Sequence, residues 1–341
     1  MTGSQNAGLS KDEAQIYDRQ IRLWGFEAQE KLRTSSILVC GLSGLGAEVV
    51  KNLMLCGIKD ITLLDEKSVK AEDYDSNFLL SPDSIGKNRA SSSTVKAQSL
   101  NPMVKCTVEE VSIESKPADF VNSFTLVVLI DQTFEATNKW NKICREKNIK
   151  FVSGSVFGWI GYGFFDFDQH YFLMPAKQDH QVFGVDCAVD DTKAVTLEDD
   201  QLVKEKISYP SFEDSIRFNW ALKFKKRTKQ RIPPAYPPLI ALIKAQEQNQ
   251  LSGNTEEDIN NVYKIFQKEV NDLNLGEKPL KDLAKEKFEY FFGSQLSPVC
   301  ATIGGLIGQE CIKALSENKE PLRNLFLYSA FHTAGVMMDA S

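Results

Sequence analysis

The stretch Ser36-Ile37-Leu38-Val39-Cys40-Gly41-Leu42-Ser43-Gly44-Leu45-Gly46-Ala47 decides the fold, because it joins a short apolar run to three closely spaced glycines. A continuous apolar run of this length is typical of a strand that is buried on both faces of a parallel sheet. Residues 47–56 then carry apolar side chains at helical spacing. The stretch therefore predicts a strand, a glycine loop and a helix in direct succession.

The glycine loop is followed, about 20 residues later, by an acidic residue at the end of the next expected strand. Glycines let a backbone approach a phosphate closely, and the free N–H groups of a helix N-terminus favour anions. A carboxylate in the position of Asp65 can accept the hydroxyl groups of a ribose. Gly41, Gly44, Gly46 and Asp65 are therefore candidate nucleotide-binding residues. The alternative is that the glycines only allow the helix to pack closely on the strand.

Strands and helices continue to alternate after the loop, and this order indicates the α/β class. The pattern predicts a doubly wound, Rossmann-like parallel sheet. A segment rich in glycine and aromatic residues, 156–167, predicts an antiparallel hairpin that extends the sheet. The expected strands are 60–65, 105–108, 125–130, 150–153 and 325–328, and the expected helices are 87–100, 133–147, one after Pro238, one capped by Thr255, 280–292 and 299–316.

The chain is expected to form one interwoven unit, because the last helix and strand need the first sheet to cover their apolar faces. Residues 177–206 are polar without a clear period, which indicates an inserted loop or small subdomain. The expected division is a flexible N-terminus at 1–15, the first part of the nucleotide-binding fold at 16–175, an insertion at 176–250, and helices and final strands completing the same fold at 251–341.

The N-terminal segment predicts a short helix with one outward-facing arginine. Ser10 begins a Ser-x-x-Glu capping pattern, and the helix is expected to end near Gly25. Tyr17 and Trp24 share one apolar face at helical spacing, and Arg19 points roughly the opposite way. Arg19 is therefore free to meet a group outside its own domain.

The composition excludes several classes of protein. The chain of 341 residues has a net charge of −6, which leaves no basic excess for a nucleic-acid partner. Its apolar runs are too short to cross a bilayer, so we expect no membrane partner. Seven cysteines without a Cys-x-x-Cys pair indicate reduced thiols. The three histidines, at positions 170, 180 and 332, are too dispersed to suggest a metal site.

Several segments together resemble the activating enzymes for ubiquitin-like proteins and their bacterial relatives MoeB and ThiF. The similarity covers residues 17–168 and 280–328, and it implies an ATP-dependent adenylation fold. The family joins the carboxyl terminus of a modifier protein to AMP and then passes it to a cysteine as a thioester. The segments that carry the resemblance are 17–25, 41–48 with 51–53, 155–162, and 298–305 with 309–310.

The length and the short central insertion are most similar to the small subunits of SUMO-activating enzymes. This resemblance implies a heterodimer with a large catalytic subunit, which holds ATP, Mg²⁺, the catalytic cysteine and a ubiquitin-like domain. SUMO and, through the partner, a conjugating enzyme are the other implied partners. The resemblance also implies a nuclear location, with some protein in the cytoplasm.

The nucleotide site is expected to be degenerate when it is set beside the motifs of active relatives. Those relatives carry Asn-x-x-Arg-Gln after the ribose aspartate, then a lysine, and later Asp-Asn-x-x-x-Arg. Here Ser76 stands in place of the arginine, and Arg89 stands about where the lysine should be. Asp131 keeps the metal-binding type, whereas Gln132 and Ala136 replace its companions.

The same resemblance implies that Arg19 keeps a functional role. It would reach across the dimer to the ATP phosphates in the partner. A permanently charged, planar guanidinium suits that role, as an arginine finger supplied in trans does elsewhere. The alternative is a solvated arginine paired with Asp18 or Glu27. A further alternative is that the chain is only a scaffold that keeps an active partner in its correct shape. The two hypotheses differ only in whether Arg19 contacts the nucleotide.

Two further motifs allow a functional and a structural interpretation. Cys300 follows a proline as a cysteine nucleophile can, but it opens an apolar helix, so we expect a buried structural thiol. The basic cluster 223–231 is either a nuclear localisation signal or a solvated helix end.

Two rival functions differ from the heterodimer in the residues that they require. A nicotinamide-dependent oxidoreductase would share the sheet and Asp65, but it requires a different glycine spacing and a proton-transfer group. A stand-alone adenylating enzyme of the sulfur-transfer type would carry paired Cys-x-x-Cys zinc ligands, which the chain lacks.

Overall fold

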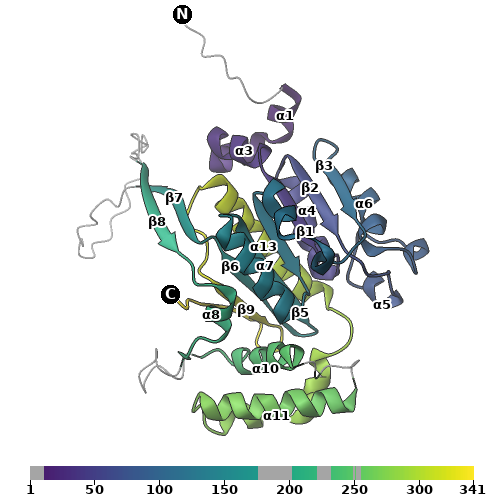
Figure 1. The fold of residues 1–341 in the computed structure, drawn as a ribbon, viewed down its shortest axis with the longest axis vertical. Helices are drawn as coiled ribbons and strands as arrows, with labels where there is room; N and C mark the ends of the chain where they lie inside the picture. The colour runs from purple at the N-terminus through teal and green to yellow at the C-terminus, as the bar shows by residue number, and fades with distance from the viewer. Residues whose placement is uncertain (1–10, 176–201, 221–231, 249, 251–254) are drawn as a thin grey trace, which may run out of the picture.

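A computed structural model describes residues 11–175, 202–220, 232–248, 250 and 255–341. Its central feature is an eight-stranded sheet in the order β10-β9-β6-β5-β4-β1-β2-β3 (Figure 1). The strands β1 to β5 run parallel to their neighbours within this group. The predicted Rossmann-like sheet is therefore confirmed. The parallel strands are β1 (Ser36–Cys40), β2 (Asp60–Leu64), β3 (Lys105–Glu109), β4 (Leu126–Ile130) and β5 (Lys150–Phe157).

Antiparallel strands extend this sheet on one side, as expected from the glycine and aromatic pattern. The strand β6 (Ile160–Asp166) forms a hairpin with β5, and β9 (Leu325–Ser329) pairs antiparallel with β6. An edge strand that was not predicted, β10 (Ala334–Met338), pairs with β9. The final strands thus lie in the same sheet as the glycine-loop strand.

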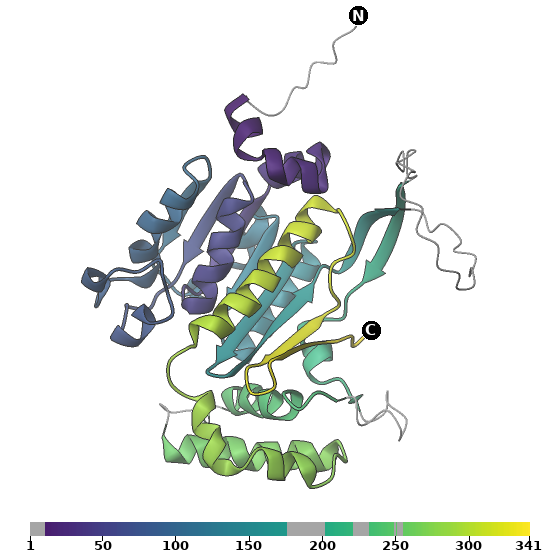
Figure 2. The same ribbon diagram turned by 180° about the vertical axis from the view of Figure 1, so that it is seen from behind.

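Helices cover both faces of the sheet because its strands are apolar on both sides. Ile37 and Val39 of β1 pack into one core, and Leu38 and Cys40 pack into the other. The first face carries α4 (Gly44–Leu55), α6 (Arg89–Leu100) and α13 (Ser297–Ser316), the last of which crosses the sheet in Figure 2. The second core contains α7 (Phe134–Glu146), α8 (Phe212–Ile216), α10 (Tyr236–Glu247) and α11 (Glu256–Asp272).

The helices α4 and α13 pack closely because two glycines of α13 face α4. A Cβ atom at Gly304 would lie 2.5 Å from Cβ of Glu48, and one at Gly308 would lie 2.5 Å from Cβ of Asn52. A Cβ atom at Gly305 would meet nothing within 4 Å. Gly304 and Gly308, and not Gly305, are therefore the glycines that this packing requires.

Two predicted helices are wrong in extent. The N-terminal helix is divided into α1 (Lys11–Ile16) and α2 (Asp18–Trp24), and Gly25, with φ of 89°, separates α2 from the unpredicted α3 (Phe26–Arg33). The helix expected at 280–292 is a short α12 (Lys278–Asp282) and a 3₁₀ helix, η5 (Lys285–Phe291). Burial of Phe288 of η5 against two aromatic rings of α11, Tyr263 and Phe266, overrides the helical spacing there.

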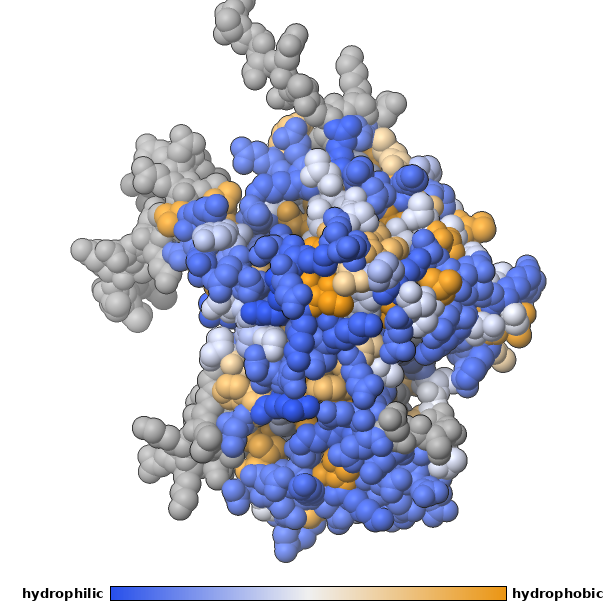
Figure 3. Space-filling view, in the orientation of Figure 1, coloured by the Kyte–Doolittle hydropathy of each residue, from blue (hydrophilic) through white to orange (hydrophobic). Residues whose placement is uncertain are grey.

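A two-stranded ribbon pairs β7 (Gln169–Pro175), which lies just before the expected insertion at 176–250, with β8 (Leu202–Ser208) inside it. Most of the polar segment 177–206 lies outside the described residues. The face in Figure 3 is mostly hydrophilic, with separate hydrophobic patches. In the described ranges, no helix is both long and apolar enough for a membrane span. The remaining short elements are α5 (Ala71–Tyr74), η1 (Pro82–Ser84), η2 (Ile113–Ser115) and η3 (Ala118–Ser123).

Candidate nucleotide site and the outward arginine

The three glycines of the loop are each pressed against the chain itself. A Cβ atom at Gly41 would lie 2.1 Å from the carbonyl oxygen of Ile130, and one at Gly46 would lie 2.1 Å from the carbonyl oxygen of Gly41. A Cβ atom at Gly44 would lie 2.6 Å from Cβ of Ser76. The φ of Gly41 is 94°, a value that residues other than glycine rarely adopt. The turn from β1 into α4 therefore requires these glycines with or without a nucleotide.

Backbone donors of the loop are bonded to side chains of the same chain. The N–H of Leu42 donates to Oδ2 of Asp65 over 2.7 Å. The N–H of Leu45, in the first turn of α4, donates to Oε1 of Gln295 over 3.2 Å. Such N–H groups are the donors that a phosphate needs at a helix N-terminus. Here at least two of them are engaged without a ligand.

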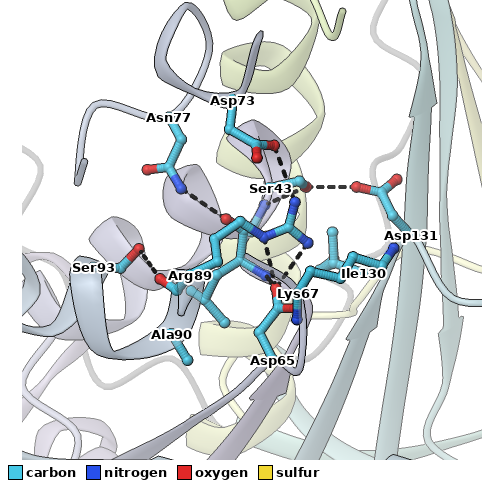
Figure 4. A network of polar contacts seen from close by, with 12 residues as sticks. Ser43, Asp65, Lys67, Asp73, Asn77, Arg89, Ala90, Ser93, Ile130 and Asp131 are labelled. Carbon is cyan, nitrogen blue, oxygen red and sulfur yellow. Dashed lines mark hydrogen bonds and ion pairs between the residues drawn. The ribbon is translucent and has the colours of Figure 1, made fainter. Parts of the chain in front are cut away.

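The expected ribose carboxylate of Asp65 is held in a buried ion pair with Arg89 (Figure 4). The Nε atom of Arg89 donates to Oδ2 of Asp65 over 2.8 Å, and its Nη1 atom donates to Oδ1 of Asp73 over 3.0 Å. Asp65 is 4% exposed and Arg89 is 6% exposed. Burial opposes the charge of Arg89, but the two carboxylates outweigh it and raise its pKa. The arginine therefore satisfies the carboxylate that a ribose would use.

The expected metal-site residue, Asp131, is likewise engaged within the chain. Its Oδ2 atom accepts hydrogen bonds from Oγ of Ser43 over 2.5 Å and from Nε2 of Gln295 over 2.7 Å. Its Oδ1 atom accepts from the N–H of Val156 over 3.2 Å. The φ of Asp131 is 51°, an uncommon conformation for a residue other than glycine. The carboxylate thus joins the glycine loop to β5 and to the segment before α13.

Of the two residues that replace the companions of Asp131, Gln132 bonds within its own segment and Ala136 has no polar side-chain group. The side-chain amide of Gln132 donates to the carbonyl of Ile130 over 2.9 Å. Ala136 is buried in the first turn of α7, where its N–H donates to Oγ1 of Thr133. The structure therefore brings Gly41, Gly44, Gly46, Asp65, Arg89 and Asp131 into one region. The side chains of Asp65, Arg89 and Asp131 bond within the chain there (Figure 4).

Two site residues were missed by the sequence analysis. Asn77 is fully buried, and its Nδ2 atom donates to the carbonyl of Leu42 over 2.7 Å. Gln295 bonds to both Leu45 and Asp131. Asn77 directly follows Ser76 and belongs to the same motif, so the sequence itself indicates a role for its amide. Nothing in the sequence connects Gln295 with a loop about 250 positions earlier.

Arg19 lies apart from this network, on the exposed side of α2. It has no hydrogen bond or ion pair to any residue within the described ranges. The alternative that it pairs with Asp18 does not occur, since Asp18 pairs with Arg22 at 3.0 Å. The helix itself is anchored, because Nε2 of Gln20 donates to the carbonyl of Leu55 over 3.0 Å. Arg19 thus projects from a fixed support.

The outward face around Arg19 also carries large apolar side chains. Leu23 lies four residues after Arg19 in α2, so these two share one side of that helix, and Ile16 ends α1 just before it. Ile16 is 60% exposed and Leu23 is 67% exposed. Leu23 and Trp24 line a pocket of about 460 Å³ together with residues of α4 and α13. This face combines the cation of Arg19 with apolar surface, and Arg22 lies one turn further along the same helix.

The cysteines and histidines form no site of their own in the described ranges. Cys300 is fully buried in α13, and burial raises the pKa of its thiol. No three His, Cys, Asp or Glu side chains gather as a metal site there. His170 is buried and His332 contacts Ser329. His180 and the basic cluster 223–231 lie outside the described residues.

Comparisons with known proteins agree with this fold. The model of the ThiF family matches residues 17–340. The subunit aos-1 of the SUMO-activating enzyme of Caenorhabditis elegans is 39% identical over 97% of this chain and 98% of its own length. Subunit 1 of the human SUMO-activating enzyme is 37% identical over 97% of this chain and 96% of its own length, and the bovine protein has the same values. The chain therefore belongs to the ThiF family.

Proposed function

We propose that the chain is the regulatory subunit of a heterodimeric SUMO-activating enzyme and that Arg19 acts in trans. The relatives are named as subunits of SUMO-activating enzymes, which favours this function over a nicotinamide-dependent oxidoreductase or a stand-alone enzyme. The observation that carries the proposal is a contrast between two cations. Arg89 is buried on the carboxylates of its own chain, whereas Arg19 is exposed without a partner in the described residues.

The chain's own pocket does not fit ATP and Mg²⁺. The carboxylate for the ribose is paired with Arg89, and the carboxylate for the metal is bonded to Ser43 and Gln295. Ser76 stands where active relatives carry an arginine, so the phosphates of a bound triphosphate would lack the bidentate hydrogen bonds of that guanidinium. We infer that ATP and Mg²⁺ are bound mainly by the large subunit.

Arg19 is suited to a nucleotide in that subunit. When the modifier carboxylate is joined to AMP, charge spreads over the phosphate oxygens, and a fixed cation is worth most where that charge develops. A guanidinium can donate two parallel hydrogen bonds to phosphate oxygens. Ile16 and Leu23 beside Arg19 would be buried against the partner, and this contact would hold the cation in position.

The transfer step belongs to the partner in this proposal. Burial raises the pKa of all six described cysteines, so their reactive thiolate forms are disfavoured. They are Cys40, Cys56, Cys106, Cys144, Cys300 and Cys311. The thioester with SUMO would form on a cysteine of the large subunit, which would also recruit the conjugating enzyme. We propose that the complex works in the nucleus and also in the cytoplasm.

The experiment is reconstitution of the heterodimer from this chain and the large subunit. SUMO-dependent exchange of pyrophosphate into ATP should require both subunits, and this chain alone should show none. Exchange by this chain alone would contradict the proposal, because it would place a working nucleotide site here. Equal exchange by the large subunit alone would remove any role for this chain.

A further inference from the structure

The structure assigns a specific role to Gln295: its side-chain amide fills the phosphate position of the glycine loop. This inference deepens the proposed function, because it rests on the conclusion that the pocket of this chain is not the working one. The Gln295 amide occupies the end of the pocket at the N-terminus of α4, where a phosphate would bind. The ribose end is closed separately by the pair of Asp65 with Arg89.

The two ends of the Gln295 amide face complementary groups. Its Oε1 atom accepts from the N–H of Leu45 over 3.2 Å and from Sγ of Cys300 over 3.5 Å. Its Nε2 atom donates to Oδ2 of Asp131 over 2.7 Å and to the carbonyl of Val156 over 3.4 Å. A neutral amide offers both an acceptor and donors, so it satisfies a helix N-terminus and a carboxylate at once.

A phosphate could not share this position with the amide. It would need the N–H of Leu45, which Gln295 already holds, and it would approach the carboxylate of Asp131 without a cation between them. The chain just after Gln295 is also held in place, because Oγ of Ser297 donates to the carbonyl of Asp75 over 2.9 Å. Gln295 and Ser297 therefore connect the start of α13 to the glycine loop and to the residue that follows α5.

The test removes the amide and offers a phosphate ligand to the full-length chain. The probe is inorganic tripolyphosphate with Mg²⁺, because it needs no ribose carboxylate and the metal would offset Asp131. A ligand that binds only the folded state raises the unfolding temperature. We expect no rise for the wild-type chain beyond that in sulfate of equal ionic strength. We expect Gln295→Ala to unfold at a lower temperature without ligand and to gain a concentration-dependent rise with it.

Two variants control the interpretation. Gln309→Ala removes an exposed glutamine of α13 and should behave as the wild-type chain. Gln295→Glu loses the donor to Asp131 and adds a negative charge, so it should be destabilised without any gain of ligand binding. The inference is wrong if the wild-type chain shows the same rise as Gln295→Ala, if Gln295→Ala shows none, or if Gln295→Glu gains one. None of these results bears on Arg19, so the proposed function stands or falls separately.

Discussion

At the scale of single residues, the side chains that the sequence predicts for nucleotide binding are bonded to other residues of the chain. Asp65 and Asp131 keep the carboxylates that a nucleotide and a metal would use, but Arg89 and Gln295 satisfy them. A buried carboxylate is costly unless it is paired. The replacement of ligand contacts by internal contacts therefore makes the loop region stable without a nucleotide.

Replacing Arg89 should consequently cost much more stability than replacing an exposed arginine. Arg89→Ala leaves Asp65 buried and unpaired, and we expect the free energy of unfolding to fall by about 3–5 kcal/mol. Arg323→Ala, which breaks an exposed pair with Glu320, should cost about 0–1 kcal/mol. Denaturation by urea measures both values. Equal losses for the two variants would show that the buried pair does not stabilise the loop.

His170 should make the chain less stable in mild acid. Burial, reinforced by the nearby charge of Lys150, lowers its pKa to about 4, while Glu317 opposes this and Lys31 adds to it. The unfolded chain, in which histidine has a pKa of about 6.5, binds the proton first as the pH falls. The contribution of neutral His170 to the free energy of unfolding is fully present above about pH 6.5. It is lost as the pH falls from that value to about 4, and the loss is roughly 3 kcal/mol.

The variant His170→Phe tests this effect. The ring of His170 lies near those of Phe167 and Phe172, so a phenylalanine ring suits this apolar position. The difference in unfolding free energy between variant and wild type should grow in favour of the variant from pH 7 to pH 5. Parallel pH profiles for the two proteins would assign the acid sensitivity to other groups.

At the scale of elements, the sequence predicts the strands well and the site contacts poorly. The strands β1 and β4 are apolar on both faces, so their sequences are continuous apolar runs whatever lies around them. The hairpin of β5 and β6 was predicted from its composition for a similar local reason. The division of the N-terminal helices depends on the single residue Gly25, and the extent of η5 depends on its burial against α11.

The contacts of the site could not be predicted because they join distant segments. The loop residues Leu42 and Leu45 are satisfied by Asp65 and Gln295, and the second of these residues belongs to the segment that leads into α13. Its position depends on how α13 packs on α4, which is a tertiary property. A degenerate site was predicted from Ser76, and it stays a prediction; the bonds that hold Asp65 and Asp131 within the chain were not predicted.

The packing of α13 on α4 gives a prediction with a control in the same helix. Gly308→Ala would place a Cβ atom 2.5 Å from Cβ of Asn52, and we expect a loss of about 1–3 kcal/mol of stability. Gly305→Ala meets nothing within 4 Å, so better helix propensity should make it neutral or slightly stabilising, by up to about 1 kcal/mol. Thermal unfolding distinguishes them. A tolerated Gly308→Ala would mean that the two helices do not need this close contact.

At the scale of the whole molecule, the residues just after α13 support the N-terminal helices, one of which carries Arg19. The Nδ2 atom of Asn318 donates to the carbonyl of Trp24 over 2.8 Å, and Lys31 pairs with Glu317 at 2.8 Å. The N-terminal helices therefore sit on the residues that follow α13. This arrangement presents an outward surface, with Arg19 and Leu23, that the other described residues leave exposed.

The apolar part of that surface should be needed for assembly. Leu23 is 67% exposed, so Leu23→Glu should leave the stability of the isolated chain unchanged while weakening its association with the large subunit at least about tenfold. Val95→Glu makes the same change at a 78% exposed valine of α6 and should have no effect. Titration of one subunit with the other measures the affinity. Unchanged affinity for Leu23→Glu would place the interface elsewhere.

The most direct test of the central claim is SUMO-dependent pyrophosphate exchange by the heterodimer with Arg19→Ala. Loss of one charged donor to the transition state should lower the exchange rate roughly 100-fold. Arg22→Ala, which removes a neighbouring exposed arginine paired with Asp18, should exchange at the wild-type rate. Both variants should still bind the large subunit. If Arg19→Ala exchanges pyrophosphate as fast as Arg22→Ala, this subunit supports its partner only as a scaffold, and the role of Arg19 in trans is refuted.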